Sequence, residues 1–372
     1  MKKLFFCKNC ISFSTRPRIT FDKKGICSAC QWSYEKKKID WKKRQKILKK
    51  LLKENRGKNS KYDCLVAVSG GKDGSYVAYN LKHKFKMNVL TVTVRPPLET
   101  ELGRKNLVSF IKSGYDHIHI SPDTEAMRIL NKIGLIEMGF PYYGWLISIH
   151  TAVIRVAHQM GIPLIFYSED GEVEYGGDTK YKNKNTYSID YQISHYLEGG
   201  YKRIIDLAKK EGMSESQLYW FTFPKLEEIK KSKTKITHFS YYENWDPYRN
   251  YLVAKEKCGL EEYKNLSEGS YTNFAQIDQD LYPLHVYLMY IKFGFGRATQ
   301  DACIDVRRGS MSREQALELS KRYDDFYPEH LFKKFCDYYQ ISEKQFHQTI
   351  DKWVNKKLFV KKNRWVPNFK IY

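Results

Sequence analysis

This chain of 372 residues lacks the sequence patterns of a membrane span, a signal peptide and a repeat protein. No apolar run approaches the roughly 20 residues that a membrane-spanning helix needs. The start, "MKKLFFCKNC", is basic like a signal peptide, but its apolar run is too short and a cysteine pair interrupts it. Internal repeats and low-complexity tracts are lacking too, so nothing indicates a repeat protein or a disordered one. We therefore expect a soluble, cytoplasmic protein.

The chain has far fewer acidic than basic residues. Lysine and arginine total 64 residues against 42 aspartates and glutamates, which gives a formal net charge of +22. Such a charge fits a nucleic-acid partner. It also fits an A/T-biased genome, because tyrosine, isoleucine and asparagine are abundant and the lysines are spread over the whole chain. This spread favours a solvated lysine surface over a nucleic-acid site.

Hydrophobic runs and helical patterns alternate in the first half of the chain. The pattern predicts buried strands at 63–68, 88–94, 116–120 and 162–168, and helices at 75–85, 101–113, 123–138 and 144–160. This alternation is typical of an α/β fold with a parallel sheet covered on both faces. Ligands of such sheets bind beyond the carboxyl ends of the strands.

The same reading divides the chain into five parts. They are a cysteine module at 1–32, a linker helix at 33–60 ending at Gly57 and Asn59, the α/β domain at 61–175, an insertion with short helices at 176–245, and a mostly helical region at 246–372. We expect the last part to complete the active site.

Four cysteines near the start have the spacing of metal ligands. Cys7 and Cys10 form one CxxC pair, Cys27 and Cys30 form another, and 16 residues separate the pairs. Four thiolates at this spacing can surround one tetrahedral Zn²⁺, and a site whose four ligands all come from the protein is expected to be structural. Two disulfides are an alternative that a cytosolic chain disfavours, and an iron–sulfur cluster is a third option.

The stretch "LVAVSGGKDGSY" (65–76) ends a buried strand with a bare polar turn. It contains neither GxxxxGK(S/T) nor GxGxxG, which excludes a P-loop and the dinucleotide fingerprint. Glycines let backbone N–H groups approach a phosphate, and the helix that follows points its positive end at the same place. Lys72 adds a mobile cation, and Asp73 can hold Mg²⁺ on phosphate oxygens.

The turn resembles the PP-loop, SGGxDS, of the ATP pyrophosphatases, which have the adenine nucleotide alpha hydrolase-like fold. Those enzymes transfer AMP from ATP to a substrate oxygen, release pyrophosphate, and let a nucleophile displace AMP. The resemblance implies that one run of residues binds ATP: Ser69, Gly70, Gly71, Lys72, Asp73, Gly74 and Ser75. Because glycine replaces the usual serine at position 74, we expect the hydroxyls of Ser69 and Ser75 to contact phosphate.

Over nearly its whole length the chain resembles the N-acetyl sugar amidotransferases of the pseudaminic acid biosynthesis type. The resemblance rests on "CKNC…CSAC", "SGGKDGSYVAYNLK", "TVTVRPPLETELGRKNL", "SEDGEVEYGG", "NWDPYRNYLVAKEKCGL" and "KFGFGRATQDACIDVRRGSMSREQA". The chain departs from the family at Asp170, where an asparagine-like residue is usual.

The family resemblance implies a defined reaction. ATP activates the acetamido carbonyl oxygen of a free or nucleotide-linked sugar, and ammonia then displaces AMP to give an acetamidino group. Such sugars enter surface glycans of flagellin or lipopolysaccharide. The chain has no recognisable glutaminase motif, so the resemblance implies that a partner resembling the imidazole-glycerol-phosphate-synthase glutaminase pair supplies the ammonia.

Acidic residues follow the fourth strand in "SEDGEVEYGGD". Their place at the carboxyl edge of the sheet favours Mg²⁺ binding, orientation of the acetamido N–H or removal of an ammonia proton over a merely solvated loop. We assign Glu169 and Glu172 to catalysis beside Lys72 and Asp73. Asp170 and Glu174 share the segment.

Arginines recur in "FGFGRATQDACIDVRR" (293–308). We expect Arg297 to bind the nucleotide or a sugar carboxylate, with a structural ion pair as the alternative, and the segment also offers Asp301, Arg307 and Arg308. Elsewhere, His150 is expected in the core. Asp246, before a proline, is expected to cap a helix.

Transfer-RNA thiolation is the alternative function, because PP-loop thiolation enzymes also combine the two motifs. They usually carry further catalytic cysteines, often as a CxxC with a third cysteine. The four remaining cysteines here are isolated and are expected to be small core residues: Cys64, Cys258, Cys303 and Cys336. This favours the sugar amidotransferase over the thiolation enzyme.

Overall fold

A computed structural model describes residues 4–57, 61–232 and 234–370. Its centre is a parallel five-stranded sheet in the order β3-β2-β1-β4-β5. The strands are β1 (Cys64–Ala67), β2 (Val89–Val94), β3 (Asp116–Ile120), β4 (Leu164–Tyr167) and β5 (Lys235–His238). The chain first builds from β1 toward β3 and then returns to the other side of β1, so the strand order reverses between β1 and β4. A reversal of this kind leaves a crevice at the carboxyl ends of the two strands.

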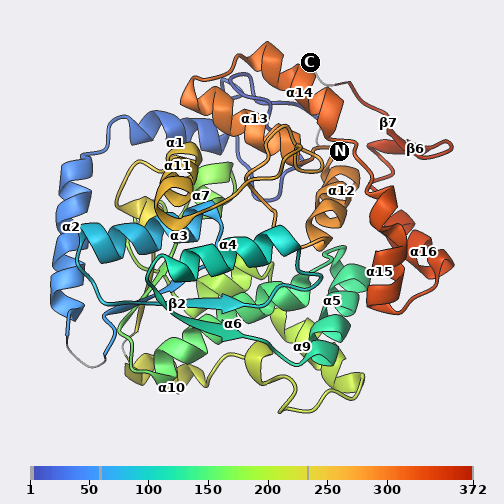
Figure 1. Cartoon of the computed structure of the whole chain (residues 1–372). Helices are drawn as coiled ribbons and strands as arrows, with labels where there is room; N and C mark the ends of the chain where they lie inside the picture. Colours follow the sequence, from blue (N-terminus) through green and yellow to red (C-terminus); the bar gives the residue numbers. More distant parts are fainter. Residues whose placement is uncertain (1–3, 58–60, 233, 371–372) are drawn as a thin grey trace.

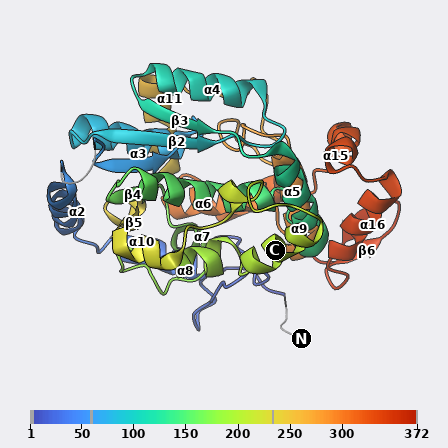
Figure 2. The ribbon, with the colours of Figure 1, turned by 90° about the horizontal axis from the view of Figure 1, so that it is seen from below.

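Helices cover both faces of the sheet. They are α3 (Lys72–Tyr79), α4 (Glu101–Lys112), α5 (Thr124–Met138), α6 (Tyr143–Gln159) and α11 (Pro247–Cys258). Successive β1 side chains alternate between two hydrophobic clusters, with Leu65 facing α5 and α6, and Val66 facing α3 and Phe110 of α4. In Figure 2, α4 and α11 accordingly lie on one side of the strands and α6 on the other.

Shorter elements fill the segment that was predicted as an insertion. They are α8 (Ile189–Tyr191), α9 (Tyr201–Lys210) and α10 (Leu226–Ser232), and α7 (Gly171–Tyr175) lies just before the segment. The prediction of short helices there is confirmed, but it missed β5, which completes the sheet beside β4. Four residues between polar stretches give too short a hydrophobic pattern to reveal a strand.

The region after 246 is mostly helical, as predicted. After α11 come α12 (Leu281–Phe293), α13 (Arg297–Arg308), α14 (Arg313–Tyr323), α15 (Phe332–Tyr339) and α16 (Glu343–Trp353). A small antiparallel hairpin of β6 (Phe359–Lys361) and β7 (Trp365–Pro367) was not predicted. In Figure 1, α15 and α16 lie at the opposite edge of the molecule from α2.

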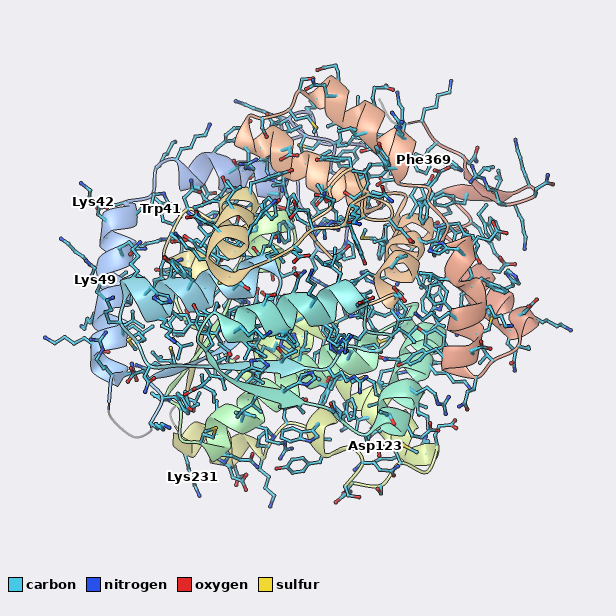
Figure 3. All side chains as sticks on the ribbon, viewed as in Figure 1. Trp41, Lys42, Lys49, Asp123, Lys231 and Phe369 are labelled. Atoms are coloured by element: carbon cyan, nitrogen blue, oxygen red, sulfur yellow. The ribbon has the colours of Figure 1, made fainter. Side chains whose placement is uncertain are left out.

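The linker at 33–60 contains two helices rather than the single one predicted. Helix α1 (Ser28–Lys36) starts inside the cysteine module, and α2 (Trp41–Asn55) starts again where the Asp40 carboxylate accepts a hydrogen bond from Lys43 N. Asn59, one of the predicted stops, lies outside the described residues. Lys42 and Lys49 of α2 are exposed and point away from the protein in Figure 3, as expected of a solvated lysine face.

The predicted fold class is confirmed: a parallel α/β sheet, a buried four-cysteine cluster near the N-terminus and a helical C-terminal region. Within the described parts of the chain, no helix is both long and apolar enough to cross a membrane.

Candidate active site

The glycine turn joins β1 to α3 at the crevice between β1 and β4. Gly70 has a φ of +80°, and a Cβ on it would lie 2.5 Å from the backbone N of Leu107, so α4 packs directly against the turn. A Cβ on Gly74 would lie 2.8 Å from the carbonyl oxygen of Ala67. Glycine at 74 therefore permits α3 to pack tightly on the end of β1.

A cavity of about 320 Å³ opens in front of this turn. The predicted residues that line it are Ser69, Gly71, Lys72, Asp73, Gly74, Glu169, Arg297 and Asp301. Ser75 does not line the cavity, because its side chain is fully buried. Its hydroxyl has no hydrogen-bond partner among the described residues. Of the two hydroxyls expected to contact phosphate, the structure brings only that of Ser69 to the cavity.

Asp73 is held from two sides. Its Oδ2 is paired with the ammonium group of Lys72, and its Oδ1 accepts a hydrogen bond of 2.9 Å from the side-chain amide of Asn250 on α11. Asn250 is fully buried. These contacts orient a carboxylate at the mouth of the turn, where a Mg²⁺ ion bound to phosphate would need an oxygen ligand.

Glu169 faces Asp73 from the end of β4. Burial first, and then the negative charge of Asp73, raise the pKa of Glu169 to about 7, while Lys72 and a hydrogen bond of 3.0 Å from the Tyr175 hydroxyl oppose the shift. A carboxyl group with a pKa near 7 can both accept and release a proton under physiological conditions.

The C-terminal region supplies the opposite wall. Asp278 is almost fully buried, and burial raises its pKa to about 6, while the nearby hydroxyls of Tyr282 and Ser69 oppose the shift. A Cβ on Gly103 would lie 2.5 Å from the Cα of Asp278, so the two walls are in close contact. Sequence reasoning singled out neither Asp278 nor Asn250.

Arg297, the first residue of α13, is also oriented toward the cavity. Its guanidinium pairs with Asp301 through two contacts of 2.9 and 3.0 Å. Asp301 in turn accepts a hydrogen bond of 2.7 Å from Ser270. The ion pair expected as the alternative is therefore present, and it fixes the arginine where it lines the cavity.

The other predicted acidic residues are not brought to the cavity. Glu172 accepts hydrogen bonds of 2.7 and 2.8 Å from Arg18 and of 2.8 Å from Asp178 N, so its carboxylate ties the N-terminal segment to α7. Asp170 caps α7 and accepts a hydrogen bond from Tyr196. Glu174 pairs with Lys36 at 2.7 Å. The structure thus gives Glu172 a structural contact in place of the predicted catalytic one.

The remaining candidates have structural contacts. Asp246 caps α11, as predicted, and pairs with Arg308 at 3.1 Å. His150 lies in the core, also as predicted, stacked against Tyr196, and burial lowers its pKa to about 4. Arg307 is half-buried close to the four-cysteine cluster.

The sulfur atoms of Cys7, Cys10, Cys27 and Cys30 all lie within 4.8 Å of one another, and all four residues are buried. Backbone N–H groups and one amide point at them, including Asn9 Nδ2 to Cys30 at 3.2 Å and Cys27 N to Cys7 at 3.2 Å. Such bonds stabilise thiolates that bind a metal. The cluster therefore has the donor set and the spacing of a metal site.

Comparison with known proteins matches one part of the chain to a described family. Residues 268–371 match the family described as "LPS biosynthesis protein WbpG-like, C-terminal domain". Asp278, Tyr282 and Arg297 belong to this segment. The uncharacterized protein MJ1599 of Methanocaldococcus jannaschii is 35% identical over 89 residues, which are 24% of this chain and 32% of that protein's length.

Two solved structures resemble the chain at low identity. The NH3-dependent NAD synthetase of Campylobacter jejuni, in complex with nitrate, is 14% identical over 52% of this chain and 95% of its own, with a TM-score of 0.29. The U34-tRNA thiolase NcsA of Methanococcus maripaludis, with its 4Fe–4S cluster, is 14% identical over 82% of this chain and 86% of its own, with a TM-score of 0.32. Scores this low support no inference about activity.

Proposed function

We propose that the protein is an AMP-forming, ATP-dependent amidotransferase that converts the acetamido group of a free or nucleotide-linked sugar to an acetamidino group during surface-glycan biosynthesis. One observation carries the proposal. Residues of the WbpG-like segment (Asp278, Tyr282 and Arg297) line the same cavity as the PP-loop-like residues Lys72 and Asp73. A segment that matches a family described by lipopolysaccharide biosynthesis thus shares one cavity with the turn that we propose binds phosphate.

The residues can divide the work as follows. The backbone of the turn, Lys72 and Arg297 bind the phosphates of ATP, and Asp73 would hold a Mg²⁺ ion, whose charge would stabilise pyrophosphate as the leaving group. The carbonyl oxygen of the acetamido group bonds to the α-phosphorus as pyrophosphate leaves. Ammonia then bonds to the activated carbon, and AMP leaves with the former carbonyl oxygen. Glu169 accepts the proton that the attacking nitrogen loses.

The four cysteines suit a structural Zn²⁺. Sulfur atoms about 2.3 Å from one zinc ion form a tetrahedron with edges of about 3.8 Å. The Sγ distances are 3.9 Å between Cys7 and Cys30 and 3.7 Å between Cys10 and Cys27. An iron–sulfur cubane, in which each cysteine binds a different iron atom, would need wider spacing.

The buried thiols favour amidination over thiolation of tRNA. Cys64 and Cys303 are buried, and burial raises the pKa of both thiols. Burial also raises the pKa of Cys258, to about 11. A sulfur carrier needs a thiolate with a lowered pKa, whereas ammonia acts as its own nucleophile. We further propose that a partner glutaminase delivers the ammonia and that the reaction takes place in the cytoplasm.

The proposal is tested with purified protein, ATP, Mg²⁺, ammonium and a panel of acetamido sugars, both free and nucleotide-linked. One sugar should release AMP and pyrophosphate and yield a product in which mass spectrometry finds NH in place of oxygen. Asp73→Ala should abolish turnover, while Asp206→Ala, an exposed aspartate on α9, should leave it unchanged. Release of ADP and phosphate would refute the proposal.

A further inference from the structure

A second cavity, of about 490 Å³, adjoins the first. The two share Ala275, Gln276, Tyr282 and Arg297 in their linings. The second lining includes several hydroxyl groups, those of Tyr263, Ser267, Ser270 and Thr272 among them. Hydroxyls suit the hydroxyl groups of a sugar, and tyrosine rings suit its apolar C–H faces.

The charged residues of this cavity are mostly neutralised by partners. Glu268 pairs with His330 at 3.0 Å, Asp280 pairs with Lys334, and Arg297 pairs with Asp301. Lys264 is exposed at the surface. A cavity with this balance suits the uncharged ring of an acceptor sugar better than the triphosphate of ATP.

Gln279 is the unusual feature of the second cavity. The residue is 2% exposed, and neither atom of its amide has a well-formed hydrogen bond to any described residue, although the Tyr282 hydroxyl lies near it. The backbone on both sides of Gln279 is fixed by hydrogen bonds. Thr100 N donates to the carbonyl oxygen of Asp278 at 3.1 Å, and Asp280 N donates to that of Leu98 at 3.0 Å. An unpaired buried amide is costly unless a ligand satisfies it.

We propose that the second cavity is the acceptor subsite and that Gln279 recognises the acetamido group. This inference rests on the proposed function. Gln279 Oε1 accepts the acetamido N–H, and Gln279 Nε2 donates to a neighbouring hydroxyl of the sugar. A secondary amide is trans, so its N–H and C=O point in opposite directions. Holding the N–H in the second cavity thereby turns the carbonyl oxygen toward the phosphates in the first.

The test compares Gln279→Met with Gln192→Met. Gln192 is a matched control, because it is fully buried, its amide also lacks a well-formed hydrogen bond to the described residues, and it lines neither cavity. Binding of UDP-N-acetylglucosamine and of UDP-glucose, which lacks the acetamido group, is measured by calorimetry without ATP. Thermal melting of each variant reports on folding.

The wild-type protein and Gln192→Met should bind the acetamido sugar about tenfold more tightly than UDP-glucose, and Gln279→Met should lose that difference. ATP affinity should stay the same in all three. Equal binding of the two sugars by the wild-type protein, or a preference that survives in a folded Gln279→Met variant, would overturn the subsite.

These measurements do not depend on the proposed reaction. If no sugar releases AMP but the binding preference and its loss in Gln279→Met are observed, the subsite stands and the reaction is wrong. If AMP is released and the acceptor KM is unchanged in Gln279→Met, the reaction stands and the subsite is wrong.

Discussion

The side-chain amide of Asn250 donates a hydrogen bond of 2.9 Å to the carboxylate of Asp73, across 177 residues of sequence. The bond joins α11 to the glycine turn and leaves the other carboxylate oxygen to Lys72. Asn250 therefore acts through Asp73, as a residue that positions the proposed Mg²⁺ ligand.

Replacing Asn250 by alanine should slow AMP formation about 10- to 100-fold, as expected when a carboxylate loses a hydrogen bond. The Mg²⁺ concentration needed for half-maximal rate should rise, which distinguishes positioning from a loss of folding. Asn131→Ala is the control, since Asn131 is also fully buried but bonds to Tyr338 and lines neither cavity. An unchanged Mg²⁺ requirement in Asn250→Ala would contradict this role.

Replacing Gly74 by serine, the residue usual at this position of the PP-loop, should lower the stability of the fold. A Cβ there would lie 2.8 Å from both Ala67 O and a methyl carbon of Val68, so Gly74→Ser should destabilise the fold by about 1–3 kcal/mol. A Cβ on Gly71 would meet only the Ser69 hydroxyl, at 3.3 Å, so Gly71→Ser should cost less. Urea unfolding measures both, and equal costs would show that the packing argument is wrong.

Asp324→Asn should have an effect on stability that changes with pH. Burial raises the pKa of Asp324 from 3.8 to about 6, while Thr299 hydrogen-bonds to its carboxylate. The folded protein thus holds this proton more tightly than the unfolded chain does. The wild-type protein therefore loses stability as the pH rises from about 4 to 6 and the carboxyl group ionises. Asparagine stays neutral. The free energy of unfolding of the variant, relative to the wild type, should therefore rise by up to about 3 kcal/mol between pH 4 and 7. A constant difference in urea titrations would contradict the shift.

Removing the metal should weaken ATP binding. Ala302 and Cys303 of α13 pack in the same cluster as the four cysteines, and α13 begins at Arg297. We expect about one zinc ion per chain, and chelation should both lower the melting temperature and reduce ATP affinity, with recovery when zinc is added. Cys336→Ser, which changes a cysteine of α15 outside that cluster, should keep its metal. Intact ATP affinity in the metal-free protein would disprove the coupling.

The features that were predicted correctly are those that residues close together in the sequence determine. The glycine turn, the strands around it and the paired cysteines are all encoded by neighbouring residues, and the structure has each of them. The position of Glu169 followed from one rule, that ligands bind at the carboxyl ends of strands. Arg297 followed only from its residue type and segment.

Other site residues depend on tertiary structure. Asn250 and Asp278 reach the cavity because α11 and the loop before α12 fold back over the turn, and no short-range pattern records that approach. For Glu172 the error was the opposite one, because the sequence pattern placed it in the site and the structure does not. It lies three residues after Glu169 in sequence, but α7 begins between them and directs the later carboxylate toward Arg18.

The central claim is that ATP activates the acetamido oxygen by adenylation. It is tested most directly by labelling that oxygen with a heavy isotope in the sugar that supports turnover and by analysing the released AMP by mass spectrometry. The proposed reaction transfers the oxygen from the sugar to the phosphate, so each AMP should carry one heavy atom. Unlabelled AMP, with the isotope retained in the sugar, would contradict the account.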